Sequence, residues 1–185
     1  MLSSGWFWLM VAIGVFWALG AYNRLMRLRA QAQQCFDALE RQLLQFPELV
    51  QQLLSEVVSA PVAAWRSDPS QMQDASHWSR LQESARQFAM ALARMHEYPL
   101  QAQSVEQVRQ TQGELQSAWD ALLEPQAYRL AVSEVLQQRW LAQLLLVQPD
   151  TERFNQAIDQ YNQAIDEFPA VLIARLYRFT PGRPL

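Results

Sequence analysis

The chain has 185 residues and a formal net charge of −3, and its pI is near 5.4. This balance argues against a nucleic-acid-binding surface, because phosphate contacts need clustered cations. Only 18% of the residues are charged, so the polar faces carry few charges. The single cysteine, Cys35, excludes an internal disulfide, fits a reducing compartment and is expected to be a small core residue.

The stretch from Gly5 to Tyr22 carries no charge. Together with Leu2–Ser4 it gives about 20 helical residues, or about 30 Å, which is the thickness of the hydrocarbon core of a bilayer. Aromatic rings favour the headgroup level, and this stretch has them near both ends. They are Trp6 and Trp8 near one end, and Trp17 and Tyr22 near the other. We therefore predict a transmembrane anchor over residues 1–23, with the lipid bilayer as its partner.

Two alternatives to an anchor remain open. A cleaved signal peptide would use residues 18–20, but it normally has Lys or Arg before its apolar part. A buried core helix would show a polar face, whereas this stretch is apolar all round. Arg24, Arg27 and Arg29 follow the stretch directly, and positive flanks stay in the cytoplasm. We therefore expect an inner-membrane protein with its N-terminus outside and a cytoplasmic domain over residues 24–185.

After the anchor, apolar residues recur at steps of three and four from Leu25 to Phe46. This spacing predicts a helix that continues the anchor as one rod about 40 residues long. Pro47 is expected to be the first residue of a second helix, which stops before Pro61.

Residues 61–74 read as a loop, and a third helix is predicted from Ser76 to the Tyr98-Pro99 step. A fourth helix follows over 105–122. Proline at positions 125 and 149 brackets a fifth, from about residue 126 to 147, and a last helix carries a repeat. No segment alternates as a strand would. The predicted fold class is all-α, an N-terminal transmembrane helix followed by an antiparallel bundle of long helices.

The repeat consists of FNQAIDQ at residues 154–160 and YNQAIDE at 161–167. Seven residues are nearly two helical turns, so equivalent residues return to one face. The predicted core stripe is Phe154, Ala157, Ile158, Tyr161, Ala164, Ile165 and Phe168. Beside it lies a polar strip of Asn155, Asp159, Asn162 and Asp166. The strip is either a solvated helix edge or a surface for a partner helix or a cation.

Aromatic-proline and aromatic-asparagine steps recur along the chain. They are Phe46-Pro47, Tyr98-Pro99, Phe168-Pro169, Tyr22-Asn23, Phe154-Asn155 and Tyr161-Asn162. In this pattern the chain resembles the LemA family as a divergent member. The resemblance implies an antiparallel helical bundle on a membrane anchor, with relatives among magnetosome proteins that organise membranes. In that family one helix usually runs on towards the Tyr-Asn pattern, whereas Pro125 and Pro149 predict an extra helix here.

Chemistry-bearing motifs are few. The His96-Glu97 step cannot begin an HExxH zinc motif, because position 100 is leucine. Two histidines and one cysteine do not indicate a metal site, and no glycine-rich phosphate loop occurs. We predict no catalytic, metal or cofactor-binding residue. The expected function is a bacterial membrane-anchored scaffold or adaptor that forms homo-oligomers. The alternative is an accessory subunit or regulator of a membrane peptidase or other envelope enzyme.

Overall fold

The computed structural model describes residues 2–59, 70–123, 132–168 and 170–185, and it places side chains from residue 6 onward except at 57–75, 124–131 and 169. Its helices are α1 (Leu2–Leu43), α2 (Gln45–Ser59), α3 (Ser70–Glu97), α4 (Ala102–Leu123), α5 (Glu134–Asp166) and α6 (Ala170–Leu176). The described residues contain no strand. The predicted all-α fold with a long apolar N-terminal helix is confirmed.

Helices α1 and α2 form a nearly continuous rod. Only Leu44 separates them, and its N–H donates to the Glu40 carbonyl oxygen at 2.9 Å, as in an unbroken helix. Pro47 lies in the first turn of α2 but is its third residue, so the prediction that it begins the helix is wrong by two residues. A proline is tolerated in a first turn because the N–H groups there lack partners within the helix.

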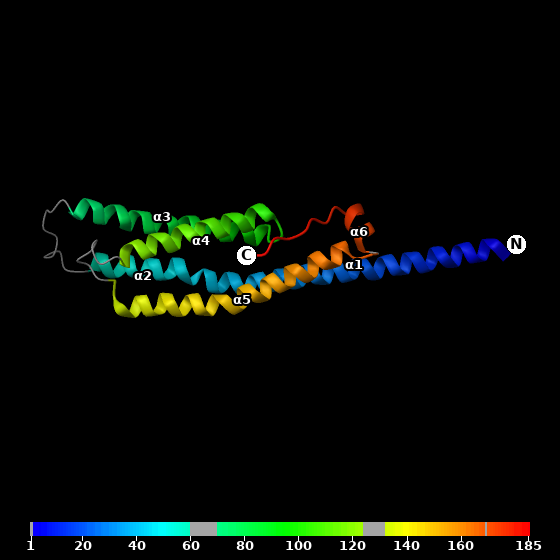
Figure 1. Ribbon diagram of the computed structural model, residues 1–185, viewed down its shortest axis with the longest axis horizontal. Helices are drawn as coiled ribbons and strands as arrows, with labels where there is room; N and C mark the ends of the chain where they lie inside the picture. The colour runs from blue at the N-terminus through cyan, green and yellow to red at the C-terminus, as the bar shows by residue number, and fades with distance from the viewer. Residues whose placement is uncertain (1, 60–69, 124–131, 169) are drawn as a thin grey trace.

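The rod, α3, α4 and α5 run in alternating directions and form an up-and-down bundle (Figure 1). Helices α3 and α4 make a hairpin whose first helix packs on α2, while α5 runs back along α2 and α1. The short α6 packs where α5 meets α1. The N-terminal part of α1 extends beyond the bundle (Figure 1).

Stacked tryptophans are buried between the end of α4 and the start of α5. The rings of Trp119 and Trp140 are 4.1 Å apart and nearly parallel, and Phe46 meets Trp140 edge-on at 4.8 Å. Trp140 Nε1 donates to Gln116 Oε1 at 3.2 Å, which satisfies the one polar atom of a buried indole. Within the described residues, the α4 and α5 backbones make no close approach, so these large rings fill the wide side of the bundle.

The repeated stripe on α5 faces the core as predicted, with one exception. Phe154 and Tyr161 are buried, as are the alanines and isoleucines at 157, 158, 164 and 165. Phe168 is 70% exposed, so its placement in the stripe is wrong. The chain leaves the helix at Glu167, which has an extended backbone, and the following ring no longer lies over the column.

Pro149 does not end a helix, which corrects the prediction of a separate helix ending at Val147. It lies inside α5, which continues to Asp166 (Figure 1). Pro149 and Leu145 are both exposed, so the carbonyl that loses its N–H partner is on the solvent side. Thr151 Oγ1 donates to the Val147 carbonyl at 3.1 Å and supports the turn around the proline. The helix therefore tolerates a proline on its solvent-exposed face.

Other helix boundaries also differ from prediction. Helix α5 begins at Glu134, capped by Ser133, whose side chain accepts from the Leu136 N–H at 3.4 Å. The predicted start near residue 126 lies outside the described residues. Helix α3 begins at Ser70 rather than Ser76, and residues 61–69 of the predicted loop are not described. Cys35 is half-buried at the edge of the main core, as a small packing residue would be.

Candidate functional site

The apolar N-terminal part of α1 lies largely outside the bundle. Every side chain from Trp6 to Gly20 is exposed. Within the described chain, Trp6–Glu56 is the one helical stretch long and apolar enough to cross a membrane. Of the 18-residue part that meets this criterion, 11% is buried. A buried core helix would show the opposite, so that alternative does not fit. The stretch is a candidate membrane span by length and composition.

The predicted anchor aromatics fall into two groups. Trp6 and Trp8 are each 67% exposed and lie on the free part of α1. Trp17 and Tyr22 instead meet the bundle, where the Trp17 ring lies 5.2 Å from Phe168 and the Tyr22 ring lies 5.4 Å from Tyr177. The second group therefore connects the apolar helix to the segment that follows α5.

The three predicted topology arginines lie at this junction, and all are exposed. Arg24 Nη1 pairs with Glu167 Oε2 at 2.9 Å, and both side chains are about half exposed, so the pair contributes little to stability. Both residues line a groove of about 270 Å³ between α1 and the segment that follows α5. The groove is lined by Phe16, Trp17, Gly20, Ala21, Arg24, Glu167, Phe168 and Ala170.

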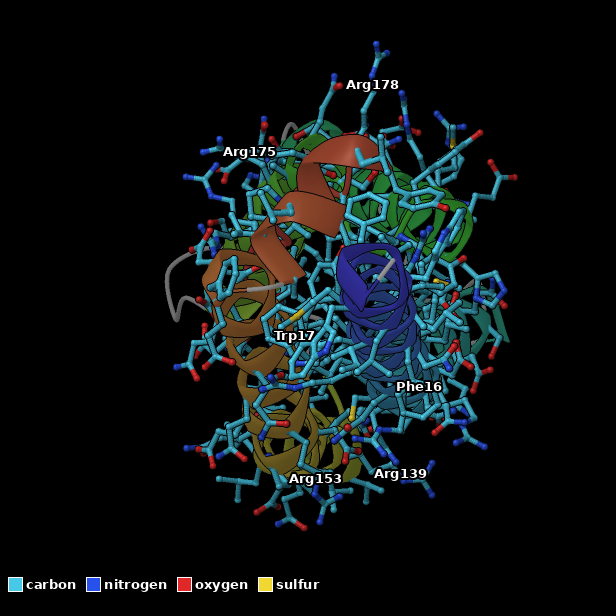
Figure 2. The ribbon with its side chains drawn as sticks, turned by 90° about the vertical axis from the view of Figure 1, so that its right-hand side faces the viewer. Phe16, Trp17, Arg139, Arg153, Arg175 and Arg178 are labelled. Carbon is cyan, nitrogen blue, oxygen red and sulfur yellow. The ribbon has the colours of Figure 1, made fainter. Side chains whose placement is uncertain are left out.

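Helix α6 presents apolar side chains to solvent beside the same junction. Leu172 and Leu176, one turn apart, are 59% and 78% exposed, and Tyr177 follows at 61%. Arg175 and Arg178 project outward here, on the side opposite Arg139 and Arg153 (Figure 2). Exposed leucines, an aromatic ring and arginines together are typical of a surface at a lipid headgroup layer. Sequence reasoning missed this helix because it has only seven residues.

The predicted polar strip divides into two parts. Asn155 and Asn162 are half-buried and bind the C-terminal segment, which we define as residues 177–185. Asn162 Nδ2 donates to the Gly182 carbonyl at 2.9 Å, and its Oδ1 accepts from the Gly182 N–H at 2.8 Å. Asn155 makes the same pair with Leu185, at 2.9 and 2.8 Å. We call these two residues the asparagine clamp. Asp159 and Asp166 are exposed, as a solvated edge would be.

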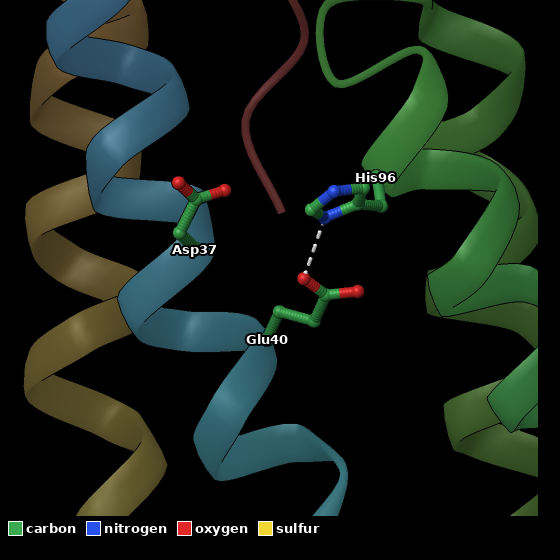
Figure 3. Close-up of side chains that lie close together, drawn as sticks. All are labelled: Asp37, Glu40 and His96. Atoms are coloured by element: carbon green, nitrogen blue, oxygen red, sulfur yellow. Dashed lines mark hydrogen bonds and ion pairs between the residues drawn. The ribbon is translucent and has the colours of Figure 1, made fainter.

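A second polar group lies between α1 and the end of α3. Asp37 and Glu40 point from α1 towards His96, whose Nδ1 is 2.8 Å from Glu40 Oε2 (Figure 3). One ligand atom from each of the three residues lies within 4.8 Å of the others, so the group could hold a divalent cation. The hydrogen bond and charge of Glu40 raise the pKa of His96. Only the Asp37–Glu40 spacing was visible in the sequence, because His96 lies 56 residues further on.

The aromatic-proline residues take structural positions. Phe46 and Pro47 are buried, and Pro99 is buried at the corner between α3 and α4, next to a half-exposed Tyr98. Asn23 is exposed, and Pro169 lies outside the described residues.

No protein-family profile, curated protein or solved structure matches the chain. The resemblance to the LemA family therefore stays a prediction.

Proposed function

We propose that the chain is a single-pass membrane protein that carries its helical bundle as a scaffold or adaptor at the cytoplasmic face of the inner membrane. It would organise protein partners or the membrane itself and have no catalytic activity of its own. One observation carries this proposal: α1 is a single helix of 42 residues that holds both the exposed apolar stretch and a stripe of bundle core. The span and the bundle are therefore joined without a linker.

The surface around α6 supports the placement of the bundle against lipid. If residues 2–23 cross the membrane, then Trp17, Tyr22 and the exposed leucines of α6 are at the headgroup level, where amphipathic rings are favoured. Arg175 and Arg178 would then meet lipid phosphates, and each arginine near an anionic surface contributes about 1 kcal/mol of attraction.

The orientation rests on Arg24, Arg27 and Arg29, which follow the apolar stretch, while Leu2–Ser4 before it carry no charge. Alkaline phosphatase fused after Leu185 tests this, because that enzyme folds only outside the cytoplasm, and a fluorescent protein fused at the same place reports the opposite side. We expect fluorescence without phosphatase activity. High phosphatase activity would overturn the orientation and favour the signal-peptide alternative.

We also propose that the chain is a divergent relative of the LemA family and forms homo-oligomers. The continuous α5 supports the first part, since the family resemblance implies one helix running on into the Tyr-Asn pattern. Crosslinking in intact membranes, followed by mass determination of the products, tests the scaffold role. Discrete products that contain two or more copies, or one copy with a defined partner, are expected. A protein recovered only as an uncrosslinked monomer at every crosslinker concentration would contradict the proposal.

A further inference from the structure

The asparagine clamp binds the main chain of the C-terminal segment rather than its side chains. Each side-chain amide pairs with both the N–H and a main-chain oxygen of one residue, Gly182 or Leu185, over distances of 2.8 to 2.9 Å. The segment runs back from α6 along the bundle (Figure 1). Because every peptide offers these two groups, the clamp would accept any extended chain of suitable shape.

The heptad repeat places the two amides at the spacing of an extended peptide. Residues seven apart on a helix are about 10.5 Å apart along its axis. Gly182 and Leu185 are three residues apart, and three extended residues span about 10 Å. The repeat that builds the α5 core stripe therefore also supplies two equivalent amides in register with every third residue of a bound chain.

Shape selects which residues fit between the two amides. A Cβ on Gly182 would lie 3.0 Å from Ile158 Cδ1 and 3.3 Å from Leu100 Cδ2, so any larger residue at this position would push against these two side chains. The side chain of Leu185 packs against the main core. The site therefore favours a small residue at the position of Gly182 and an apolar residue at the position of Leu185.

Contacts from α4 complete the site on its other side. Arg109 Nη2 donates to the Pro184 carbonyl at 2.9 Å. Arg183 Nη1 lies 3.6 Å from Glu106 Oε2, and both side chains are exposed. This pair favours a basic residue directly after the glycine of the bound segment. The bound segment thus bridges α4 and α5.

We propose that the asparagine clamp is an exchangeable peptide site, and that its second occupant is the C-terminal segment of another copy of this chain. The groups that it recognises lie in residues 182–185, which every copy carries. The segment leaves α6 through Arg178, a non-glycine residue at φ 54°, where a change of few backbone angles would redirect it. This inference rests on the proposed anchoring, because copies in one membrane hold their clamps and segments at the same height.

The first test measures binding of a fluorescent peptide of residues 177–185 to the full-length protein in mild detergent. The receptor is the Gly182→Val variant, whose own segment fits the clamp poorly. We expect saturable binding, and binding at least tenfold weaker to the wild type, whose own segment competes at an effective concentration in the millimolar range. A peptide carrying Gly182→Val should not bind. A receptor with Asn162→Leu added should lose at least tenfold in affinity, whereas Gln163→Leu on the exposed face should not.

A Leu185→Ser receptor serves as a second choice if the valine variant does not fold, which circular dichroism checks. Absence of peptide binding to a folded receptor would overturn the site.

Exchange between copies is tested with two differently tagged full-length variants. One carries Asn155→Leu and Asn162→Leu with an intact segment, and the other carries Gly182→Val with an intact clamp.

The two variants should copurify when mixed, and neither should self-associate through the clamp. Peptide binding without copurification would overturn the second-copy occupant. Membrane fractionation of the same variants reports anchoring separately, so failure of the clamp and failure of the proposed function are distinguishable.

Discussion

The two halves of α1 share one backbone conformation and differ in their surroundings. From Trp6 to Gly20 every side chain is exposed, and apolar residues occur all around the helix. From Leu25 to Leu43 the buried residues, together with half-buried Leu28, recur at steps of three and four, and this half packs against α5 and the core. The difference shows that the surroundings of a helix are predicted by how its apolar residues are distributed around it. Helix formation alone does not predict them.

The junction between these halves contacts the segment that follows α5. Ala21 and Tyr22 are half-buried, and Trp17 and Tyr22 contact rings that follow α5. No loop intervenes, since α1 is helical throughout. The bundle would therefore follow any tilt of the apolar half.

The largest expected effect is loss of the bundle through the second half of α1. Leu39 is fully buried, so Leu39→Asp would bury an unpaired carboxylate and lower the free energy of unfolding by about 3–5 kcal/mol. That is comparable with the whole stability of many domains. Gln34→Asp, on the exposed face of the same helix, should change it by less than about 0.5 kcal/mol. Thermal melts followed by circular dichroism compare the two, and equal melting temperatures would mean that the core is misplaced.

In the first half of α1 the same kind of substitution should act on membrane insertion instead. An aspartate at the centre of a span costs about 2.5–3.5 kcal/mol of insertion free energy. Ile13 is 56% exposed, so Ile13→Asp should leave the melting temperature of the bundle unchanged and reduce the fraction that pellets with membranes. Ile13→Leu is the matched control. A normal membrane fraction for the aspartate variant would argue against a span here.

The smallest expected effect is a pH dependence at the His96–Glu40 pair, which joins α3 to the second half of α1. The pKa of His96 is raised above 6.5, first by its hydrogen bond to Glu40 and then by the charges of Glu40, Asp37 and Glu97. Protonated His96 therefore favours the folded state. This contribution is complete below the unfolded pKa and disappears as pH rises through the folded one.

The pH test compares the wild type with His96→Gln. The wild type should melt slightly higher than the variant below about pH 6, and the two should melt together above about pH 9. In a Glu40→Gln background, His96→Gln should no longer change the melting temperature at low pH. A wild-type advantage that grows with pH would contradict the assigned direction.

The helical periodicity of the sequence was enough to predict the bundle, the rod and the buried face of α5. Its predictions were wrong at Phe168 and Pro149, where neighbouring residues outweighed the local sequence rule. Phe168 continues the seven-residue spacing of Phe154 and Tyr161, but it precedes a proline, which disfavours helical backbone, and it lies outside the helix. Pro149 should break a helix, but buried Val147 and Phe154 hold α5 in place on both sides of it.

The candidate sites were less predictable than the fold. The asparagine clamp joins residues 20 to 30 positions apart, and the C-terminal segment has no periodicity that would reveal its position. The one usable signal was that the repeat conserves Asn155 and Asn162 at equivalent positions. The His96 group depends on the packing of α3 against α1, which no local pattern shows.

Cysteine reactivity along α1 measures its surroundings most directly. Cys35 is the only native cysteine, so a Cys35→Ala background allows single cysteines at each position from Leu9 to Phe16 and from Gln31 to Leu39. The full-length variants are reconstituted in lipid vesicles and treated with a charged maleimide, and denatured samples define complete labelling. An anchored α1 predicts protection on every face of the first stretch and reactivity only at the exposed positions of the second. Labelling throughout the first stretch would contradict the membrane anchor.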